Sequence, residues 1–278
     1  MNSKRKLGNE VGIVMAAALS SAAASSPSVV SFKLSADFPI VMARIAGTDV
    51  PLQFDSGDQS TLVLHRSVLD RIKAQPTGES VKMHDLKGNV MESPTYRIPR
   101  FQIGRARFTD VIARLDIHDA SYQATDAGQK GFLGTGLFKS YEVVFDYAHR
   151  TMTLVPRADG EGPSKNCKGI SVPFAPEWKG EPVTEVYTDL GRVVLWWDTG
   201  SPVSVLNKKV VREARPSLSE DFFTTRQFTL AGTDFGPLRL DTWDMSLPPG
   251  FDGLLGYNFF AQHVVCIDFP NKQIVIPQ

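Results

Sequence analysis

Two matching segments, far apart in the chain, constrain what it can fold into. In each, a carboxylate, a hydroxyl residue and a glycine interrupt a run of apolar residues. The two copies are Asp55-Ser56-Gly57 and Asp198-Thr199-Gly200, which lie 143 residues apart. A carboxylate at the end of a buried strand is costly unless it has a function there. We therefore expect one site that is built from both halves of the chain.

The repeat extends downstream of both copies. A Gly-rich segment at 131–138 aligns with 253–260, and an apolar segment at 141–147 aligns with 263–269. The order, spacing and residue types agree over about a hundred residues, which predicts an internal duplication. Asp146 and Asp268 also repeat, but each lies where an apolar segment enters a turn, so we interpret them as turn residues.

Each copy of the Asp motif is followed downstream by two apolar residues and a glycine. These triplets are Phe132-Leu133-Gly134 and Leu254-Leu255-Gly256. With both elements present twice, the chain resembles the aspartic proteases. Each half is most similar to a retropepsin-like domain of bacterial type, and both lie on one chain as in pepsin-like enzymes. The resemblance covers about residues 37–278. It implies a mainly β fold of two pseudo-symmetric lobes of the closed-barrel type.

The resemblance also implies a domain organisation. The N-terminal lobe is expected at 37–156 and the C-terminal lobe at 181–278. Residues 157–180, which are rich in Gly, Pro and Lys, are expected to connect them. Alternating apolar patterns between turn signals predict mostly short strands in both lobes. Short helices are expected after the Asp motifs, over 66–74 and 208–215.

The first residues predict export. A basic start at 4–6, an apolar stretch at 11–19 and small residues at 22–24 are typical of a signal peptide, here 1–24. The stretch is short for a membrane span, which takes about 20 residues. The alternative is a free amphipathic leader. We expect a periplasmic or secreted protein with no stable membrane span after signal cleavage.

Composition and missing motifs exclude several classes of function. Thirty basic and thirty acidic residues give no net charge, so nucleic acid is not an expected partner. No Gly-x-Ser-x-Gly element occurs, which argues against a serine hydrolase. The histidines show no pairing at metal-ligand spacing, so no metal is expected; they are His65, His84, His118, His149 and His263.

The resemblance implies a specific chemistry for the repeated motif. Gly57 and Gly200 allow sharp turns that bring the two carboxylates together. Asp55 and Asp198 then share one proton, as aspartic-protease dyads do. One carboxylate takes a proton from water while the other donates to the carbonyl oxygen of the scissile amide. The supporting residues are Ser56, Gly57, Thr199, Gly200 and Ser201.

This predicts an aspartic endopeptidase that acts on peptide or protein substrates, requires no cofactor and is a monomer. The alternative is a catalytically weak or inactive peptide-binding protein that retains the protease cleft. The sequence leaves the substrate and the pH optimum open.

The first half carries extra residues between the Asp motif and the Gly-rich segment. Residues of about 80–94 within it alternate and turn like a hairpin. We interpret them as a flap that closes over bound peptide and excludes water. The alternative is an ordinary surface hairpin. The flap residues expected to meet substrate are Met83, His84, Asp85 and Gly88.

One position departs from the family pattern. In pepsin-like members, a hydroxyl at the position of Ser201 donates a hydrogen bond to the catalytic carboxylate. The first half has Asp58 there, which cannot donate when ionised. If Asp58 points inward it adds a third negative charge that raises the pKa of the dyad. If it points to solvent it is only a turn residue.

The two cysteines of an exported chain permit a disulfide bond. Cys167 lies in the expected connection between lobes and Cys266 in a predicted strand. The alternative is that Cys266 is a small buried apolar residue with a free thiol.

Overall fold

The computed structural model describes residues 26–278 except 86, 118–127, 159, 166, 177–180, 217–220 and 248–249. The predicted signal peptide at 1–24, His118 and part of the predicted connection at 157–180 lie outside the described residues. Strands dominate the part of the chain that is described, which confirms the predicted mainly β class.

The strands of the first half are β1 (Ser28–Ser35), β2 (Phe38–Ile45), β3 (Thr48–Asp55), β4 (Leu62–Leu64), β5 (Gln75–His84), β6 (Val90–Ile103), β7 (Ala106–Leu115), β8 (Gly131–Gly134), β9 (Tyr141–Asp146) and β10 (Thr151–Pro156). The strands of the second half are β11 (Gly169–Pro173), β12 (Val183–Thr188), β13 (Gly191–Trp197), β14 (Val205–Asn207), β15 (Phe222–Thr224), β16 (Phe228–Leu230), β17 (Thr233–Asp234), β18 (Arg239–Trp243), β19 (Gly253–Leu255), β20 (Val265–Asp268) and β21 (Gln273–Pro277). Short helical turns follow the Asp motifs and the Gly-rich segments: α1 (Arg66–Arg71), α2 (Lys208–Ala214), η2 (Thr135–Phe138) and α3 (Tyr257–Phe260).

The first half closes into a barrel. Its strands run in the order β2-β3-β8-β4-β7-β6, and β2 also pairs with β6 to complete the ring. Within the ring, β8 lies between β3, to which it is parallel, and β4, to which it is antiparallel. Such an arrangement brings the C-terminal end of β3 to the middle of the sheet.

The second half has the same local arrangement but remains open. β19 is parallel to β13 and antiparallel to β14, as β8 is to β3 and β4. The strand β16 pairs with β12, but it pairs with β17 on its other side and not with β18. β16 takes the place that β6 has in the first half, but β16 has three residues whereas β6 has fourteen. β16 is therefore too short to close the ring.

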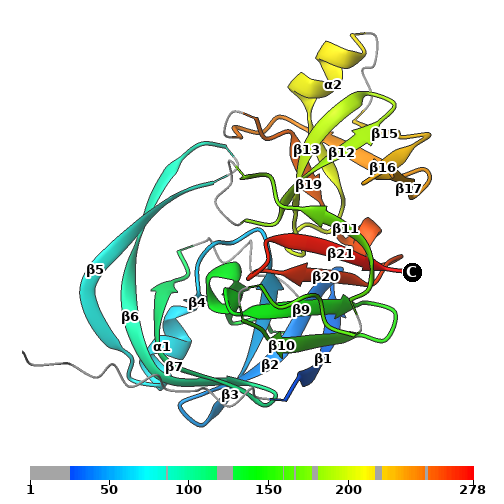
Figure 1. Cartoon of the computed structure of the whole chain (residues 1–278). Coiled ribbons are helices and arrows are strands. Elements are labelled where there is room, and N and C mark those ends of the chain that lie inside the picture. Colours follow the sequence, from blue (N-terminus) through cyan, green and yellow to red (C-terminus); the bar gives the residue numbers. More distant parts are fainter. Residues whose placement is uncertain are drawn as a thin grey trace, which may run out of the picture.

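A third group of strands joins the two halves. In the order β11-β21-β20-β9-β10-β1 it combines strands from both ends of the chain (Figure 1). Two of its members lie outside the predicted lobes: β1 lies before residue 37, and β11 lies inside the segment expected to be a connection. Cys266 pairs with Val144 across β20 and β9, and Cys167 forms a disulfide bond with Cys266. The permitted disulfide is therefore present.

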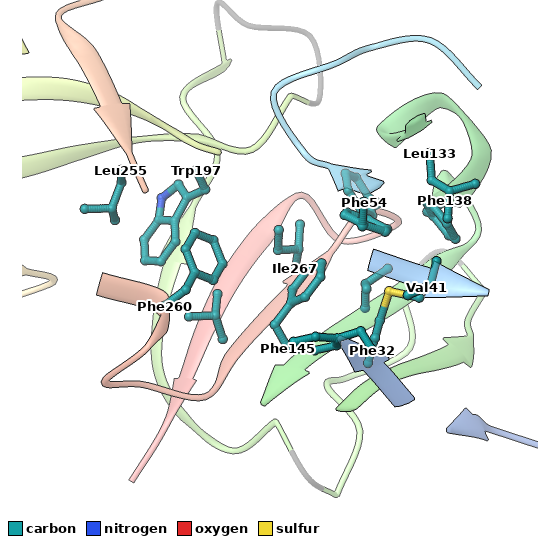
Figure 2. Packing of buried hydrophobic residues seen from close by; sticks show 14 of the residues in the cluster. Phe32, Val41, Phe54, Leu133, Phe138, Phe145, Trp197, Leu255, Phe260 and Ile267 are labelled. Carbon is teal, nitrogen blue, oxygen red and sulfur yellow. The ribbon is translucent and has the colours of Figure 1, made fainter. Parts of the chain in front are cut away.

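The core anchors the ends of the two strands that carry the Asp motifs. Phe54 is fully buried and packs on Phe138 and Phe145, at 4.9 and 4.8 Å between ring centroids. Trp197 is also fully buried and packs on Phe260 at 5.9 Å. Figure 2 shows Phe145 between these two groups, and its ring lies 5.9 Å from that of Phe260. The residue before each motif is thus held by one continuous core.

No helix among the described residues is both long and apolar enough to cross a membrane.

Candidate active site

Matching turns present the two carboxylates. Asp55 is the last residue of β3, and Asp198 directly follows β13. In each turn the N–H two residues on donates to the carboxylate, from Gly57 to Asp55 Oδ1 at 2.9 Å and from Gly200 to Asp198 Oδ1 at 2.7 Å. These hydrogen bonds hold each carboxylate against its own turn.

The structure brings Asp55 and Asp198 into contact, and their carboxyl groups are joined by a hydrogen bond. Each also lies against the glycine of the opposite turn. A Cβ placed on Gly57 would be 2.6 Å from Asp198 Cγ, and one on Gly200 would be 2.5 Å from Asp55 Cγ. Real side chains do not approach so closely, so glycine is required at both positions. That the pair is catalytic stays a prediction.

Ser56 and Thr199 lock the two turns together beneath the carboxylates. Ser56 Oγ donates to the carbonyl of Trp197 at 2.6 Å, and Thr199 Oγ1 donates to that of Phe54 at 2.9 Å. The backbone N–H of each residue donates to the hydroxyl of the other, at 2.9 and 3.1 Å. Both hydroxyls are fully buried, where hydrogen bonds without competing water are strong. The two residues thus act as supports and do not face a substrate.

Burial raises the pKa of both carboxyl groups. The pKa of Asp55 lies well above its ordinary 3.8 because the group is removed from water and lies beside the charge of Asp198. Burial raises the pKa of Asp198 to about 6, against the lowering effects of the Gly200 N–H and the hydrogen bond with Asp55. Two like charges in contact resist double ionisation, so we expect the pair to hold one proton and to titrate as a unit.

These raised pKa values predict a pH-dependent gain in stability for Asp198→Asn. A carboxyl whose pKa is higher in the folded state makes folding less favourable as the pH rises from about 4 through about 6, and the penalty is complete above that range. Removing the ionisable group should increase the free energy of unfolding at pH 7–8, on the order of 3 kcal/mol, and leave it nearly unchanged at pH 4. Denaturant unfolding of the parent and variant at both pH values measures this. An equal difference at both would contradict it.

Asp58 points neither at the dyad nor freely into solvent. Its Oδ2 lies 2.6 Å from Nη2 of Arg114, and its Oδ1 accepts the N–H of Ser60 at 2.7 Å. Arg114 is buried, and its Nε donates to Ser60 Oγ at 2.8 Å. An ion pair was not among the two orientations considered from the sequence. It is possible because β4 and β7 are parallel neighbours, which places Arg114 above the turn.

Ser201 does not have the role that the resemblance implies. Its hydroxyl donates to the carbonyl of Val203 at 2.6 Å, so its single hydrogen is not directed at Asp198. Neither half therefore supplies a side-chain hydroxyl donor at this position.

The predicted flap forms the end of a long hairpin. β5 and β6 leave the barrel together and curve toward the second half (Figure 1). Met83 pairs with Met91 on the face that also carries the buried Ser93, whereas His84 is exposed. At the turn, Gly88 lies against Ser246 of the second half, where an added Cβ would be 3.1 Å from Ser246 Cβ. The hairpin thus spans from one half to the other.

The side chain of Asp85, one of the predicted flap residues, stabilises the turn of the hairpin. Asp85 is occupied within the turn, where its Oδ1 accepts the N–H groups of Lys87 and Asn89 at 2.9 and 2.8 Å. These hydrogen bonds and that from the Asn89 side chain lower the pKa of Asp85. Contact of Met83, His84, Asp85 and Gly88 with substrate stays a prediction.

Sequence reasoning missed three residues that hold the site. Arg114 pairs with Asp58, and Trp196 Nε1 donates to the carbonyl of Ser56 at 2.9 Å across the two halves. Glu181 is buried and accepts from Thr135 Oγ1 and from Lys139 Nζ, both at 3.4 Å. Burial raises the pKa of Glu181, and Lys139 opposes this. Charged residues within apolar strands, such as Arg114, were the signal available from the sequence.

The second pair of repeated acids serves turns. Asp146 Oδ1 accepts the N–H of His149 at 2.9 Å, and Asp268 Oδ1 accepts that of Asn271 at 3.1 Å. Within the described ranges, no group of three or more His, Cys, Asp or Glu residues could hold a metal ion.

Comparison with known proteins bears on the family and the fold. Residues 41–136 match the aspartyl protease family. No curated protein matches the sequence. Among solved structures, the aspartic proteinase from Irpex lacteus has a similar fold, with a TM-score of 0.60 and 12% sequence identity over 91% of this chain and 97% of that chain. At this identity the likeness establishes the fold alone. The family match over residues 41–136 and the shared fold both support an aspartyl protease of the pepsin or retropepsin type.

Proposed function

We propose that the chain is an aspartic endopeptidase in which Asp55 and Asp198 activate water against a peptide bond. The observation that carries this is the pair of hydrogen-bonded carboxyl groups, presented by matching turns and raised in pKa by burial. Such a pair holds one proton over a wide pH range, which is the state that combines a base and an acid in one site.

The reaction then follows from that single proton. The ionised carboxylate takes a proton from water as the oxygen attacks the carbonyl carbon of the substrate. The protonated carboxyl donates to the carbonyl oxygen, so a neutral tetrahedral diol forms. Proton transfer to the amide nitrogen and loss of the C–N bond give an amine and a carboxylic acid, and the dyad again holds one proton. The Ser56 and Thr199 lock keeps the two carboxylates at a fixed separation throughout.

Substrate is proposed to lie as an extended peptide between the dyad and the hairpin at 80–94. The contact between Gly88 and Ser246 supports this, because it carries the tip of the hairpin from the first half to the second, and the dyad combines one carboxylate from each half. Exclusion of water there strengthens the electrostatic interactions of the dyad.

We also propose that the protein acts after export, in the periplasm or outside the cell. The disulfide bond between Cys167 and Cys266 supports this location, since such bonds persist in oxidising compartments.

The test is digestion of a mixed peptide library at pH 3 to 7, with products identified by mass spectrometry. Parent protein should produce internal cleavages that Asp198→Asn does not. Binding of peptides by the parent without any cleavage would instead favour the alternative, an inactive peptide-binding protein.

A further inference from the structure

The Asp58–Arg114 ion pair exists in only one of the two matching turns. Asp58 corresponds to Ser201, and Arg114 corresponds to Thr242, since Arg114 pairs with Val63 where Thr242 pairs with Leu206. The second half thus has neutral hydroxyl residues where the first half has a carboxylate and a guanidinium. The difference lies directly beside Gly57, whose N–H binds Asp55.

Asp58 is held from several sides. Its side chain binds Arg114 and the N–H of Ser60, and its carbonyl accepts the N–H of Thr135 at 2.7 Å and Thr135 Oγ1 at 3.1 Å. Because Thr135 follows β8 and Asp55 lies opposite Gly134, these bonds tie the turn to the strand beside it. The turn therefore has little freedom to change the position of Asp55.

Arg114 depends on Asp58 for its charge balance. Its side chain is about 6% exposed, and within the described part of the chain its Nη1 has no hydrogen-bond partner. A buried cation is costly unless an anion compensates for it. The anion in contact with Arg114 is Asp58. The negative charge of Asp58 contributes to the raised pKa of Asp55 and Asp198, and without Arg114 that charge would act on the dyad uncompensated.

We infer that Arg114 is a positioning residue for the proposed reaction: it binds Asp58 in the turn next to Asp55 and offsets the charge of that carboxylate at the dyad. This rests on the proposed function. The pair sets the pH at which the dyad holds one proton, and it does so from one half only. The other titratable and charged groups near Asp58 and the dyad include Glu181, Lys139 and Tyr147, with Tyr257 and Asp37 beside Tyr147.

The test compares three variants by the pH dependence of kcat and kcat/KM on one cleavable peptide. Arg114→Met keeps most of the side-chain volume but leaves Asp58 uncompensated, so both limbs of the pH profile should move up by about one pH unit. Asp58→Asn leaves the cation uncompensated, so both limbs should move down by a similar amount. Arg114→Lys keeps the charge, so its limbs should stay near those of the parent.

The matched control is Arg215→Met. Arg215 Nη2 also lies 2.6 Å from a carboxylate oxygen, that of Asp189, but it follows α2 at the outer end of the second half (Figure 1). The pH profile of Arg215→Met should match that of the parent.

If Arg114→Met does not fold, the double variant Asp58→Ser with Arg114→Thr places the neutral residue types of the second half in the first half. Its limbs should lie between those of the two charge variants.

Overlapping profiles for Arg114→Met, Asp58→Asn and the parent would overturn the inference. Titration of the Asp55 and Asp198 carboxyl carbons by NMR separates this inference from the proposed function. If the parent cleaves no peptide but the titrations of both carboxyls still move in opposite directions in the two variants, the endopeptidase proposal fails and the role of Arg114 stands. Unmoved titrations overturn the inference whether or not the parent is active.

Discussion

Asp55→Asn and Asp198→Asn should each lower kcat by about 10²–10⁴-fold, with KM for peptide nearly unchanged. An amide in either position cannot accept a proton from water and cannot share one with the remaining carboxylate. The loss falls on kcat because the carboxyl groups act on the reacting atoms and not on the rest of the peptide. Steady-state kinetics at the optimal pH of the parent, on one internally cleaved peptide, gives both constants.

Asp146→Asn is the control for this result, because it changes a carboxylate that repeats in the sequence but supports a turn at the surface. It should keep the kcat of the parent. The folded state of each variant is checked by thermal unfolding, where Asp198→Asn is expected to be at least as stable as the parent at neutral pH. A folded Asp55→Asn or Asp198→Asn variant with the kcat of the parent would show that cleavage does not use this pair.

The central part of the site could be predicted because it is repeated. A carboxylate, a hydroxyl residue and a glycine after an apolar strand indicate a sharp turn. A second copy at the same place in a second half indicates a partner across a pseudo-two-fold axis. The contact between Asp55 and Asp198 required no detail beyond this pattern. The residues after the two turns, Asp58 and Ser201, differ from each other, and there the prediction of their contacts was incomplete.

The contacts that were missed depend on pairings between distant segments. Arg114 reaches Asp58 across 56 residues because β4 and β7 are parallel neighbours, and no local pattern specifies which residues face each other there. The hydroxyl of Ser201 donates to the carbonyl of Val203, a contact that depends on the geometry of the turn and not on the residue type alone. β11 was missed because Gly, Pro and Lys dominate its surroundings, while its pairing with β21 stabilises it as a strand.

Gly200→Ala and Gly57→Ala should lower kcat by about 10²-fold or more, although neither residue carries out a chemical step. The added methyl group would lie 2.5 Å from Asp55 Cγ or 2.6 Å from Asp198 Cγ, well inside the distance that two carbon atoms allow. The carboxylate that it meets is also held by the N–H of its own turn, so it cannot move without breaking that hydrogen bond. The two turns must therefore separate, and the buried lock between Ser56 and Thr199 opposes this.

This steric clash should lower both the activity and the stability of the glycine variants. Overpacking at a buried site costs about 1–3 kcal/mol, so the unfolding free energy of both variants should fall by that amount while the fold persists. Gly162→Ala is the matched control, because a methyl group there meets no neighbouring atom within 4 Å and its backbone is not in the left-handed region. It should retain the kinetics and stability of the parent. Unlike Asp198→Asn, the glycine variants keep both carboxyl groups, so a loss of kcat in them reports the separation of the dyad and not its protonation. If Gly200→Ala kept the kcat of the parent, the close approach of the opposite carboxylate would have no part in catalysis.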